Sequence, residues 1–400
     1  MQDHRRLGRE LELFHSDPLV GAGLPLWLPR GAAARRAVED YLFELERRHG
    51  YQHVYSPPLA KAEMYHRSGH LPHYADDMFP VMALSADDAY VLRPSICPHH
   101  AAVFAARGRS YRELPLRIGE IGGQYRAERS GVLGGLSRVR AISLNDGHVF
   151  CAEDQVEAEI IAALDVMREA HAALGFEPDK WRLSLRGDGD KYVDEPAMWD
   201  ESTDILKRAL GELSIPYEEA EGEAAFYGPK IDIQVVDHAG RESTLATVQV
   251  DFWQPARFDL SYVDADGKRK RPVMVHRSAA GSMERLFAHL IEVHDGAFPA
   301  WYAPVQVEVL PVGDVAVRGF ADRCRGLGLR VEEAYDGSLG ARIRDAVLRR
   351  VPFVAVLGAQ ELANDSVSIR SREGVAELPV AEALELLAKQ SRPQGSSVPV

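Results

Sequence analysis

The chain has 400 residues, of which 46% are hydrophobic and 27% charged, and a formal net charge of −13. This length exceeds what one hydrophobic core usually supports, so we expect two domains. The negative charge argues against bulk, sequence-independent binding of nucleic acid, although a local basic surface could still dock a structured RNA. No apolar run approaches the roughly 20 residues that span a bilayer, and no targeting segment is visible. Three cysteines are too few for a disulfide framework, which favours a reducing cytoplasm.

The first predicted element is an amphipathic helix over 32–49, where apolar residues recur at helical spacing. A strand is expected over 51–57, closed by a pair of prolines that belong at a strand end or a sheet edge. Residues 65–79 show no clear period and carry three histidines, so we predict a loop lying over a pocket.

A long hairpin over 116–150 is the central feature. Two apolar, strand-like segments, 116–125 and 140–150, flank a loop rich in Gly, Ser and Arg. The first strand delivers Arg126 at its end. Because side chains alternate along a strand, we expect Asp146 and His148 to share one face of the second strand. A guanidinium, a carboxylate and an imidazole would thus converge on one pocket.

The remaining pattern predicts an antiparallel sheet flanked by helices, occupying residues 1–302. Its other expected elements are a strand over 90–93, helices over 94–107, 153–174, 198–213 and 278–294, a strand over 181–186, two strands within 223–252 and a strand ending at His276.

The pattern changes at Ala303-Pro304, beyond which strands and helices alternate as an α/β unit over 303–390. Strands are expected over 305–312, 329–334, 353–358 and 367–371, and helices over 315–327, 339–350 and 380–389. Three arginines, Arg342, Arg349 and Arg350, are expected to give the middle helix a basic side for RNA phosphates. The tail over 391–400, rich in Ser, Pro and Gly, is expected to be disordered.

Segments spread over nearly the whole chain resemble, in their order and spacing, those of the class II threonyl-tRNA synthetases. They include DHRRLGRELELF, SGHLPHYADDMF, LRPSICPHH, ELPLRIGEIGGQYRAERSG, NDGHVF, AAFYGPKIDI, TVQVDF, VMVHRSAAGSMERL and RIRDAVLRRVPFVAVLG. The resemblance implies a class II catalytic domain over 1–302, homodimeric through the segment containing Pro57, and an α/β anticodon-binding domain over 303–390. The activity it implies is activation of L-threonine with ATP, followed by transfer to tRNA(Thr). Because the chain begins directly at the catalytic domain, we expect no N-terminal editing domain, and hence seryl-tRNA formation without clearance in cis.

The resemblance also implies one zinc ion per chain. Its ligands would be Cys97, His148 and His276. Three protein ligands leave zinc an open position, which the family uses to bind the amino nitrogen and the hydroxyl of threonine. Valine, which lacks the hydroxyl, is thereby rejected. A rival pairing of His148 with Cys151 is disfavoured, because the two side chains face opposite ways three positions apart in a strand. His99 and His100, beside Cys97, are competing candidates.

Further roles follow from the same resemblance. The expected catalytic residues are Arg126, Arg285 and His70. The expected amino-acid pocket consists of Asp146, Tyr227, Lys230 and Gln249. ATP, accompanied by Mg²⁺, is expected to contact Arg126, Glu128, Arg138, Ser282 and Arg285. The expected anticodon contacts are Glu361 and Arg370.

Several positions depart from the usual pattern of the family. They are Ser95, Ile96, Tyr125, Ala127, Leu144, Asn145 and Thr244. Three readings therefore stay open. The first is a working threonyl-tRNA synthetase, of which an inhibitor-tolerant second copy is one form. The second is a paralogue that transfers the activated amino acid to a non-tRNA acceptor. The third is an RNA-binding or regulatory pseudo-synthetase, against which the retained arginines and zinc ligands argue.

Overall fold

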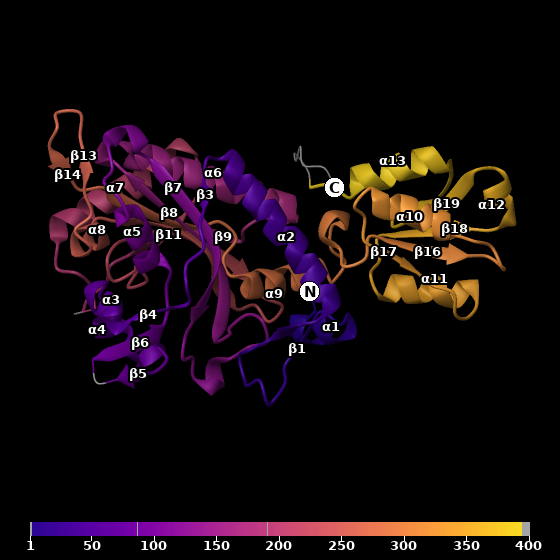
Figure 1. The fold of residues 1–400 in the computed structure, drawn as a ribbon, viewed down its shortest axis with the longest axis horizontal. Coiled ribbons are helices and arrows are strands. Elements are labelled where there is room, and N and C mark those ends of the chain that lie inside the picture. Colours follow the sequence, from indigo (N-terminus) through magenta and orange to yellow (C-terminus); the bar gives the residue numbers. More distant parts are fainter. Residues whose placement is uncertain (1, 86, 190, 394–400) are drawn as a thin grey trace.

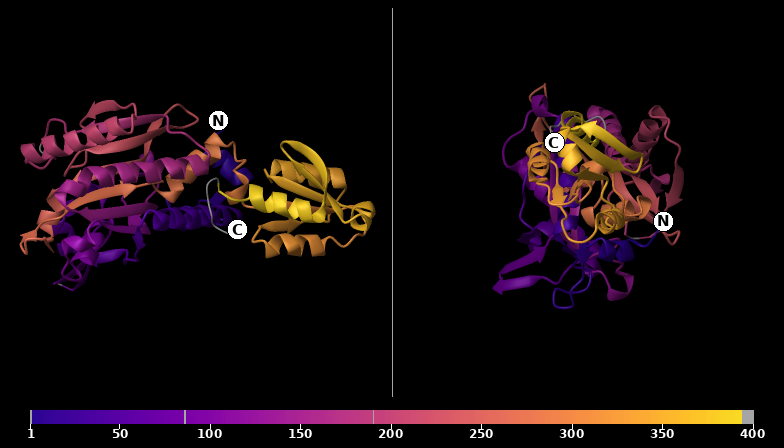
Figure 2. Two further views of the ribbon diagram at one scale, coloured as in Figure 1. Left: turned by 90° about the horizontal axis from the view of Figure 1, so that it is seen from above. Right: turned by 90° about the vertical axis from the view of Figure 1, so that its right-hand side faces the viewer.

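The computed structural model describes residues 2–85, 87–189 and 191–393. Figure 1 shows two domains, each built on its own sheet, and Figure 2 shows that they are arranged end to end. The second domain lies near the start of helix α2 (Pro29–Arg48), where Arg30 is 3.6 Å from Glu332. None of the helices in these described ranges is long and apolar enough to cross a membrane.

The first domain is organised around an eight-stranded sheet with the strand order β10-β9-β11-β12-β15-β8-β7-β3. In that order the strands are Glu218–Glu221, Lys180–Leu185, Lys230–Val236, Glu242–Asp251, Val273–Ser278, Ala141–Cys151, Leu116–Tyr125 and Gln52–His53. The six central strands pair antiparallel, whereas β10 and β3 pair in parallel at the two edges. The expected antiparallel fold class is confirmed.

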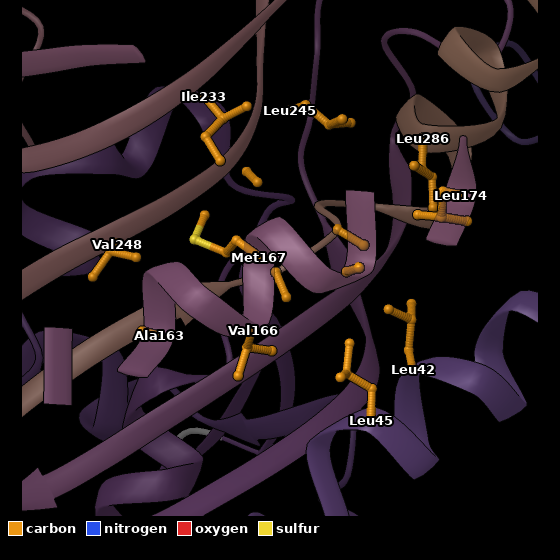
Figure 3. Close-up of a cluster of buried hydrophobic side chains, with 14 of the residues drawn as sticks. Leu42, Leu45, Ala163, Val166, Met167, Leu174, Ile233, Leu245, Val248 and Leu286 are labelled. Carbon is orange, nitrogen blue, oxygen red and sulfur yellow. The ribbon is translucent and has the colours of Figure 1, made fainter. Parts of the chain in front are cut away.

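Three helices cover one face of this sheet and bury its core. They are α2, α6 (Val156–Leu174) and α9 (Met283–Val293). Figure 3 shows Leu42 and Leu45 of α2 beside Val166 of α6, and Met167 beside the strand residue Val248. Each such side chain contributes about 1.5–3 kcal/mol when fully buried. On the other face, Phe150 and Met274 pack with Phe104 in a smaller apolar cluster, and the rest of the central strands is left for polar side chains.

Shorter elements complete the first domain. The helices are α1 (His4–Glu10), α3 (Ala62–Arg67), α4 (His70–Tyr74), α5 (Cys97–Ala105), α7 (Pro196–Glu212) and α8 (Trp253–Arg257). The strands are β1 (Phe14–His15), β2 (Leu26–Trp27), β4 (Leu59–Lys61), β5 (Met82–Ser85), β6 (Asp88–Leu92), β13 (Tyr262–Val263) and β14 (Arg269–Lys270).

Three local predictions for this domain were wrong. Residues 65–79 form short helices, α3, α4 and a 3₁₀ turn over Ala75–Asp77, rather than a loop. These helices were missed because each is too short to show a helical period. The strand expected over 51–57 is limited to β3, which ends at His53, four residues before Pro57. The segment AAFYGP before β11 is a turn, closed by a bridge between Ala225 and Gly228.

The second domain has a five-stranded mixed sheet with the order β17-β16-β18-β19-β20. In that order the strands are Val331–Glu333, Val307–Pro311, Phe353–Leu357, Ser366–Ser371 and Gly374–Pro379. The helices are α10 (Arg318–Gly326), α11 (Leu339–Leu348), α12 (Ala359–Ala363) and α13 (Val380–Gln390). The expected α/β unit is confirmed, but the sequence did not reveal β20, which is a largely exposed edge strand, or α12, which is one short turn. Most of the predicted disordered tail, residues 394–400, lies outside the described residues.

Candidate active site and metal centre

One row of polar side chains crosses the open face of the large sheet. His148 of β8 pairs with His276 of β15, which pairs with Gln249 of β12, which in turn pairs with Lys230 of β11. Directly paired residues in antiparallel strands project from the same face, so strand register alone aligns these four side chains. They come from segments as far apart as residues 148 and 276.

Two adjoining cavities of about 280 Å³ each lie over this row. Five residues line both cavities, so the two form one cleft: Ser95, Arg126, Tyr227, Lys230 and Gln249. The first cavity is also lined by Cys97, Asp146, His276 and Arg285, whereas the second reaches His70. The cleft therefore contains residues from all the predicted catalytic and amino-acid-binding sets.

Cys97, His148 and His276 meet at the floor of the cleft. Cys97 begins helix α5, and one ligand atom from each residue lies within 4.8 Å of the others. The closest pair is Nε2 of His148 and Nδ1 of His276, 2.9 Å apart. All three residues are buried. Thiolate and imidazole are the ligands that zinc prefers, and three of them leave one position open.

The hydrogen bonds of His276 support a cation at this point. Its Nε2 is 2.8 Å from Oδ2 of Asp251, and since a carboxylate only accepts, the ring proton lies on Nε2. The lone pair of Nδ1 then points at His148, an arrangement that needs a proton or a metal ion between the two rings. Burial alone would lower the pKa of His276, but Cys97 and Asp251 raise it to about 10. The residues present therefore fit a zinc ion.

A second group of potential ligands, Asp3, His4 and Glu292, also lies within 4.8 Å. Here the ligand atoms are already occupied by protein donors. Nε2 of His4 accepts the amide hydrogen of Leu136, and Glu292 accepts the amide hydrogen and a ring hydrogen of His238 as well as one from Nδ1 of His4. This group is a hydrogen-bonded contact between α1 and α9 rather than a metal site.

The rival ligands lie elsewhere. Cys151 projects from the opposite face of β8 into the core, where burial raises the pKa of its thiol. Burial lowers the pKa of His99 to about 4, and its ring lies against Tyr65. His100 does approach the site, because its Nδ1 is 2.8 Å from Nδ1 of His148, on the side away from His276.

Asp146 lies beside the cluster of Cys97, His148 and His276, on the face that alternation predicts. Its Oδ1 is 4.0 Å from Nε2 of His148, and the amide of Gln124 donates to its Oδ2 at 3.3 Å. Asp146 is buried, and burial raises its pKa. A cation held next to it would favour the charged carboxylate, which is the form that accepts a hydrogen bond from a hydroxyl.

Two guanidinium groups, those of Arg126 and Arg285, line the first cavity of the cleft. Arg126 follows β7 and has no carboxylate within 4.0 Å in the part of the chain that the structure describes. Arg285, in the first turn of α9, donates to the carbonyls of Ser137 (3.1 Å) and Thr244 (2.5 Å). Burial, together with the nearby Arg126 and Arg138, lowers the pKa of Arg285 to about 10. Arg138 is paired with Glu128, but Arg126 and Arg285 form no ion pair with a described carboxylate, so together they make a site for an anion such as a polyphosphate.

The predicted amino-acid pocket is held by hydrogen bonds and stacking. The hydroxyl of Tyr227 donates to Oε1 of Gln249 at 2.5 Å, and its ring stacks on His276 with centroids 5.0 Å apart. Lys230 forms an ion pair of 2.7 Å with Asp232. Tyr227 therefore fixes both the ring of His276 and the amide of Gln249.

The other predicted nucleotide contacts lie around Arg285. Glu128 and Arg138 form an ion pair of 2.9 Å across the hairpin loop. Ser282 caps α9 by accepting the amide hydrogen of Arg285 at 3.1 Å.

His70 begins α4, where Ser68 contacts its Nδ1 at 2.8 Å. Burial, with the charge of Arg126 second, lowers the pKa of His70 to about 3. Such an imidazole is neutral and is a weak base.

Two of the departures from the family pattern have visible consequences. Oγ of Ser95 lies 2.9 Å from Sγ of Cys97, so its hydroxyl can donate to a thiolate there. Asn145 faces away from the cleft and donates to Glu46 at 2.7 Å; Glu46 in turn pairs with the buried Arg277 at 2.6 Å. Sequence reasoning missed this ion pair, together with Asp251, because only strand register places them.

In the second domain, the predicted anticodon contacts Glu361 and Arg370 have separate surroundings. Glu361 caps its own helix α12 by accepting the amide hydrogen of Gly358, and Arg370 is exposed on β19. The predicted basic side of α11 was wrong: Arg342 donates to two backbone carbonyls, and Arg349 pairs with Glu308 and Glu332. Arg350 lies 3.8 Å from Asp295. These charges are used inside the protein.

Comparison with known proteins identifies the family. Residues 82–294 match the tRNA synthetase class II core domain (G, H, P, S and T), and residues 306–390 match an anticodon binding domain. Because the first match spans more than half of the 400 residues, the chain belongs to the class II tRNA synthetases.

Among individual proteins, the chain is similar to the threonine-tRNA ligases. It is 47% identical over 377 residues to that of Staphylococcus epidermidis, which covers 92% of this chain and 58% of the relative. It is 47% identical over 376 residues to that of Listeria monocytogenes, with 92% and 59% covered. The chain thus spans about three fifths of the length of these curated relatives.

Solved structures agree. A crystal structure described as the RNA binding domain of threonyl-tRNA synthetase from Cryptosporidium parvum superposes with a TM-score of 0.92 at 31% identity, covering 98% of this chain and 100% of that one. Prolyl-tRNA synthetase of Giardia lamblia superposes with a TM-score of 0.75 at 18% identity, covering 97% and 78%, and supports the fold alone.

Proposed function

We propose that this chain activates L-threonine with ATP to form threonyl-adenylate and transfers the threonyl group to tRNA(Thr). Residues 1–302 would be the catalytic domain and residues 303–390 the anticodon-binding domain. The observation that carries the proposal is the meeting of Cys97, His148 and His276 within 4.8 Å, next to Asp146 in a cleft that is also lined by Arg126 and Arg285. The similarity to threonine-tRNA ligases supports the same substrate.

In this proposal Cys97, His148 and His276 hold one zinc ion per chain. When bound, the ion supplies a Lewis acid with an open position for the amino nitrogen and hydroxyl of threonine. Asp146 accepts the hydrogen bond of that hydroxyl. Valine has the same shape but no hydroxyl, so it would leave Asp146 without its partner. Tyr227, Lys230 and Gln249 enclose the amino acid from the neighbouring strands.

Adenylate formation requires the carboxylate of threonine to attack the α-phosphate of ATP, so positioning and charge neutralisation dominate. Arg126 is placed at the junction of the two cavities, where it can bind both the carboxylate and the α-phosphate. Arg285 binds the phosphate tail, Mg²⁺ accompanies the ATP, and Glu128, Arg138 and Ser282 hold the nucleotide side of the cleft.

For the transfer step, His70 lies in the cavity that Arg126 joins to the amino-acid pocket. Because its pKa is lowered to about 3, we assign it a hydrogen bond to the terminal ribose of the tRNA rather than removal of a proton. In the second domain we assign the anticodon contacts to Glu361 and Arg370.

The same proposal includes a homodimer and a cytoplasmic location. The segment around Pro57 lies at the edge of the sheet, and the side chain of Tyr55 beside it is 88% exposed. An exposed strand edge of this kind is commonly covered by a partner. The three cysteines are unpaired and buried, which suits a reducing compartment.

The test is amino-acid-dependent pyrophosphate exchange, followed by charging of tRNA(Thr). We expect exchange with threonine, weaker exchange with serine, and exchange with valine reduced by about 10⁴, the discrimination typical of a site built around a hydroxyl. Absence of exchange with every amino acid would identify a non-catalytic RNA-binding protein. Exchange with threonine but no charging of tRNA would indicate another acceptor.

A further inference from the structure

Three buried side chains run in series behind the metal centre. Nδ1 of His148 is 2.8 Å from Nδ1 of His100, and Nε2 of His100 is 3.4 Å from Oε2 of Glu120. His148 and His100 are fully buried, and Glu120 is 3% exposed. Neither His100 nor Glu120 lines the cleft, so neither is placed to touch a substrate.

The chemistry of the three groups allows one arrangement of protons that leaves His148 able to bind a cation. Each neutral imidazole carries one proton and one lone pair, and a carboxylate only accepts. His100 therefore donates from Nε2 to Glu120, which leaves its Nδ1 as an acceptor. His148 donates from Nδ1 to that acceptor, and its Nε2 lone pair faces His276. The reverse arrangement would place a proton on Nε2 of His148, in the position that a ligand atom must keep free.

Glu120 is itself held in place. Ser56 donates to its Oε2 at 2.6 Å, and Arg93 donates to its Oε1 at 3.1 Å. Arg93 is only 2% exposed and also donates to the carbonyl of Gly123 at 2.5 Å. Burial alone would raise the pKa of Glu120, but His100, Ser56 and Arg93 together lower it to about 2. The end of the series is thus a fixed carboxylate.

We propose that His100 and Glu120 are positioning residues of the metal centre, which hold His148 in the tautomer whose Nε2 is free to bind the metal. The inference rests on the proposed function in taking zinc as the ion. The role of His100 behind His148 parallels that of Asp251, which holds His276 through Nε2 on the other side of the site. Such partners behind a metal-binding histidine typically change metal affinity by 10–100-fold.

The experiment measures zinc affinity by competition with a chelator, and the absorption spectrum of the cobalt-substituted protein, for the full chain and three variants. H100L removes the acceptor for His148, and we expect zinc to bind about 10–100-fold more weakly. In E120Q the side-chain amide can donate to His100, so the direction of the hydrogen bonds in the series is no longer fixed. Zinc should again bind more weakly. H100Q restores an acceptor and a donor in one side chain and should recover most of the affinity and the spectrum of the unaltered protein.

H99L is the matched control, because His99 is the neighbouring buried histidine on α5 but lies against Tyr65. Its zinc affinity should equal that of the unaltered chain. If H100L and E120Q bind zinc as tightly as the unaltered chain, or if H99L weakens binding as much as they do, the inference is wrong. Should H100L fail to fold, E120Q and H100Q still decide it. A chain that binds zinc through this series yet activates no threonine would contradict the proposed function and leave this inference standing.

Discussion

His276 and His148 lie directly opposite one another on β15 and β8, with Nδ1 of the first 2.9 Å from Nε2 of the second. Both rings are anchored from behind, His276 by Asp251 and His148 by His100. Two anchored lone pairs this close repel each other unless a cation lies between them. The site is thus preorganised for a positive charge, on which the proposed pocket for the amino acid would depend.

Metal removal should therefore cost stability as well as activity. A ligand that binds only the folded state stabilises it by about 2.7 kcal/mol at a concentration 100 times its Kd. We expect chelation to lower the unfolding midpoint and to abolish threonine-dependent pyrophosphate exchange, and readdition of zinc to restore both. C97S should resemble the chelated protein, whereas C151S, altered on the opposite face of β8, should keep its zinc. Chelated protein with undiminished threonine-dependent exchange would contradict the proposed role of the ion.

Removal of one partner of the ion pair between Glu46 and Arg277 should cost more stability than removal of both. Both side chains are fully buried and 2.6 Å apart, and Gly147 makes room for the guanidinium, since a Cβ there would lie 2.8 Å from it. R277M leaves the buried carboxylate of Glu46 without its guanidinium, with only His53 (2.7 Å) and Asn145 still bonded to it, which should cost about 3 kcal/mol. The double variant E46L/R277M should recover much of that loss. Urea unfolding followed by tryptophan fluorescence measures both, because all five tryptophans lie in the first domain.

If R277M and the double variant are equally destabilised, the cost comes from lost packing and not from the unpaired charge. Asn145, which donates to Glu46, offers a further comparison. N145A removes one hydrogen bond to the carboxylate and should cost about 1–3 kcal/mol, less than removal of the guanidinium.

Stability should fall as the pH is lowered, because the buried His171 remains neutral in the folded chain. His171 donates from Nε2 to the carbonyl of Ala279 at 2.9 Å, and burial lowers its pKa from 6.5 to about 4. The unfolded chain takes up the proton below pH 6.5 and the folded chain does not, so stability is lost as the pH falls from 6.5 toward 4. Between pH 7.5 and pH 5.5 this one group should cost about 1.4 kcal/mol.

H171Q keeps a donor for Ala279 but does not titrate, so it should reduce the pH dependence of the free energy of unfolding by about that amount. The comparison uses the difference between the two pH values, which cancels any constant packing defect. H15Q, at an exposed histidine, is the control. An H171Q protein with the pH dependence of the unaltered chain would show that His171 is not the group responsible.

Local patterns were sufficient to predict part of this site. Alternation along β8 placed Asp146 and His148 on one face and Cys151 on the other, because the side-chain period of a strand is a local property. It could not pair His148 with His276, 128 residues away, since register is decided by tertiary packing. That link came from the resemblance to a family.

His100 illustrates the same limit. From the sequence it was only a competing ligand beside Cys97, and its contact with His148 depends on how α5 packs against β8. The prediction for the arginines of α11 failed in the opposite way, because it assigned an external role to side chains that have internal partners. Arg342 and Arg349 look like a basic surface in the sequence, but carbonyl groups and the buried Glu308 take up their charge in the folded chain. Charge counts do not reveal such internal partners.

Substitution of Arg126 should change activity alone, whereas substitution of Arg285 should change both activity and stability. Arg126 has no ion pair among the described residues, whereas Arg285 joins Ser137 to Thr244 through their carbonyls. R126K loses the planar fork that binds a carboxylate and a phosphate together, so threonine-dependent pyrophosphate exchange should fall by about 10²–10³ with an unchanged unfolding midpoint. R285K should lower both. R129K, at an exposed arginine of the same hairpin loop, should change neither. If R126K exchanges pyrophosphate at the rate of R129K, the anion bound during the reaction lies elsewhere in the cleft, and Arg126 serves only the loop that carries it.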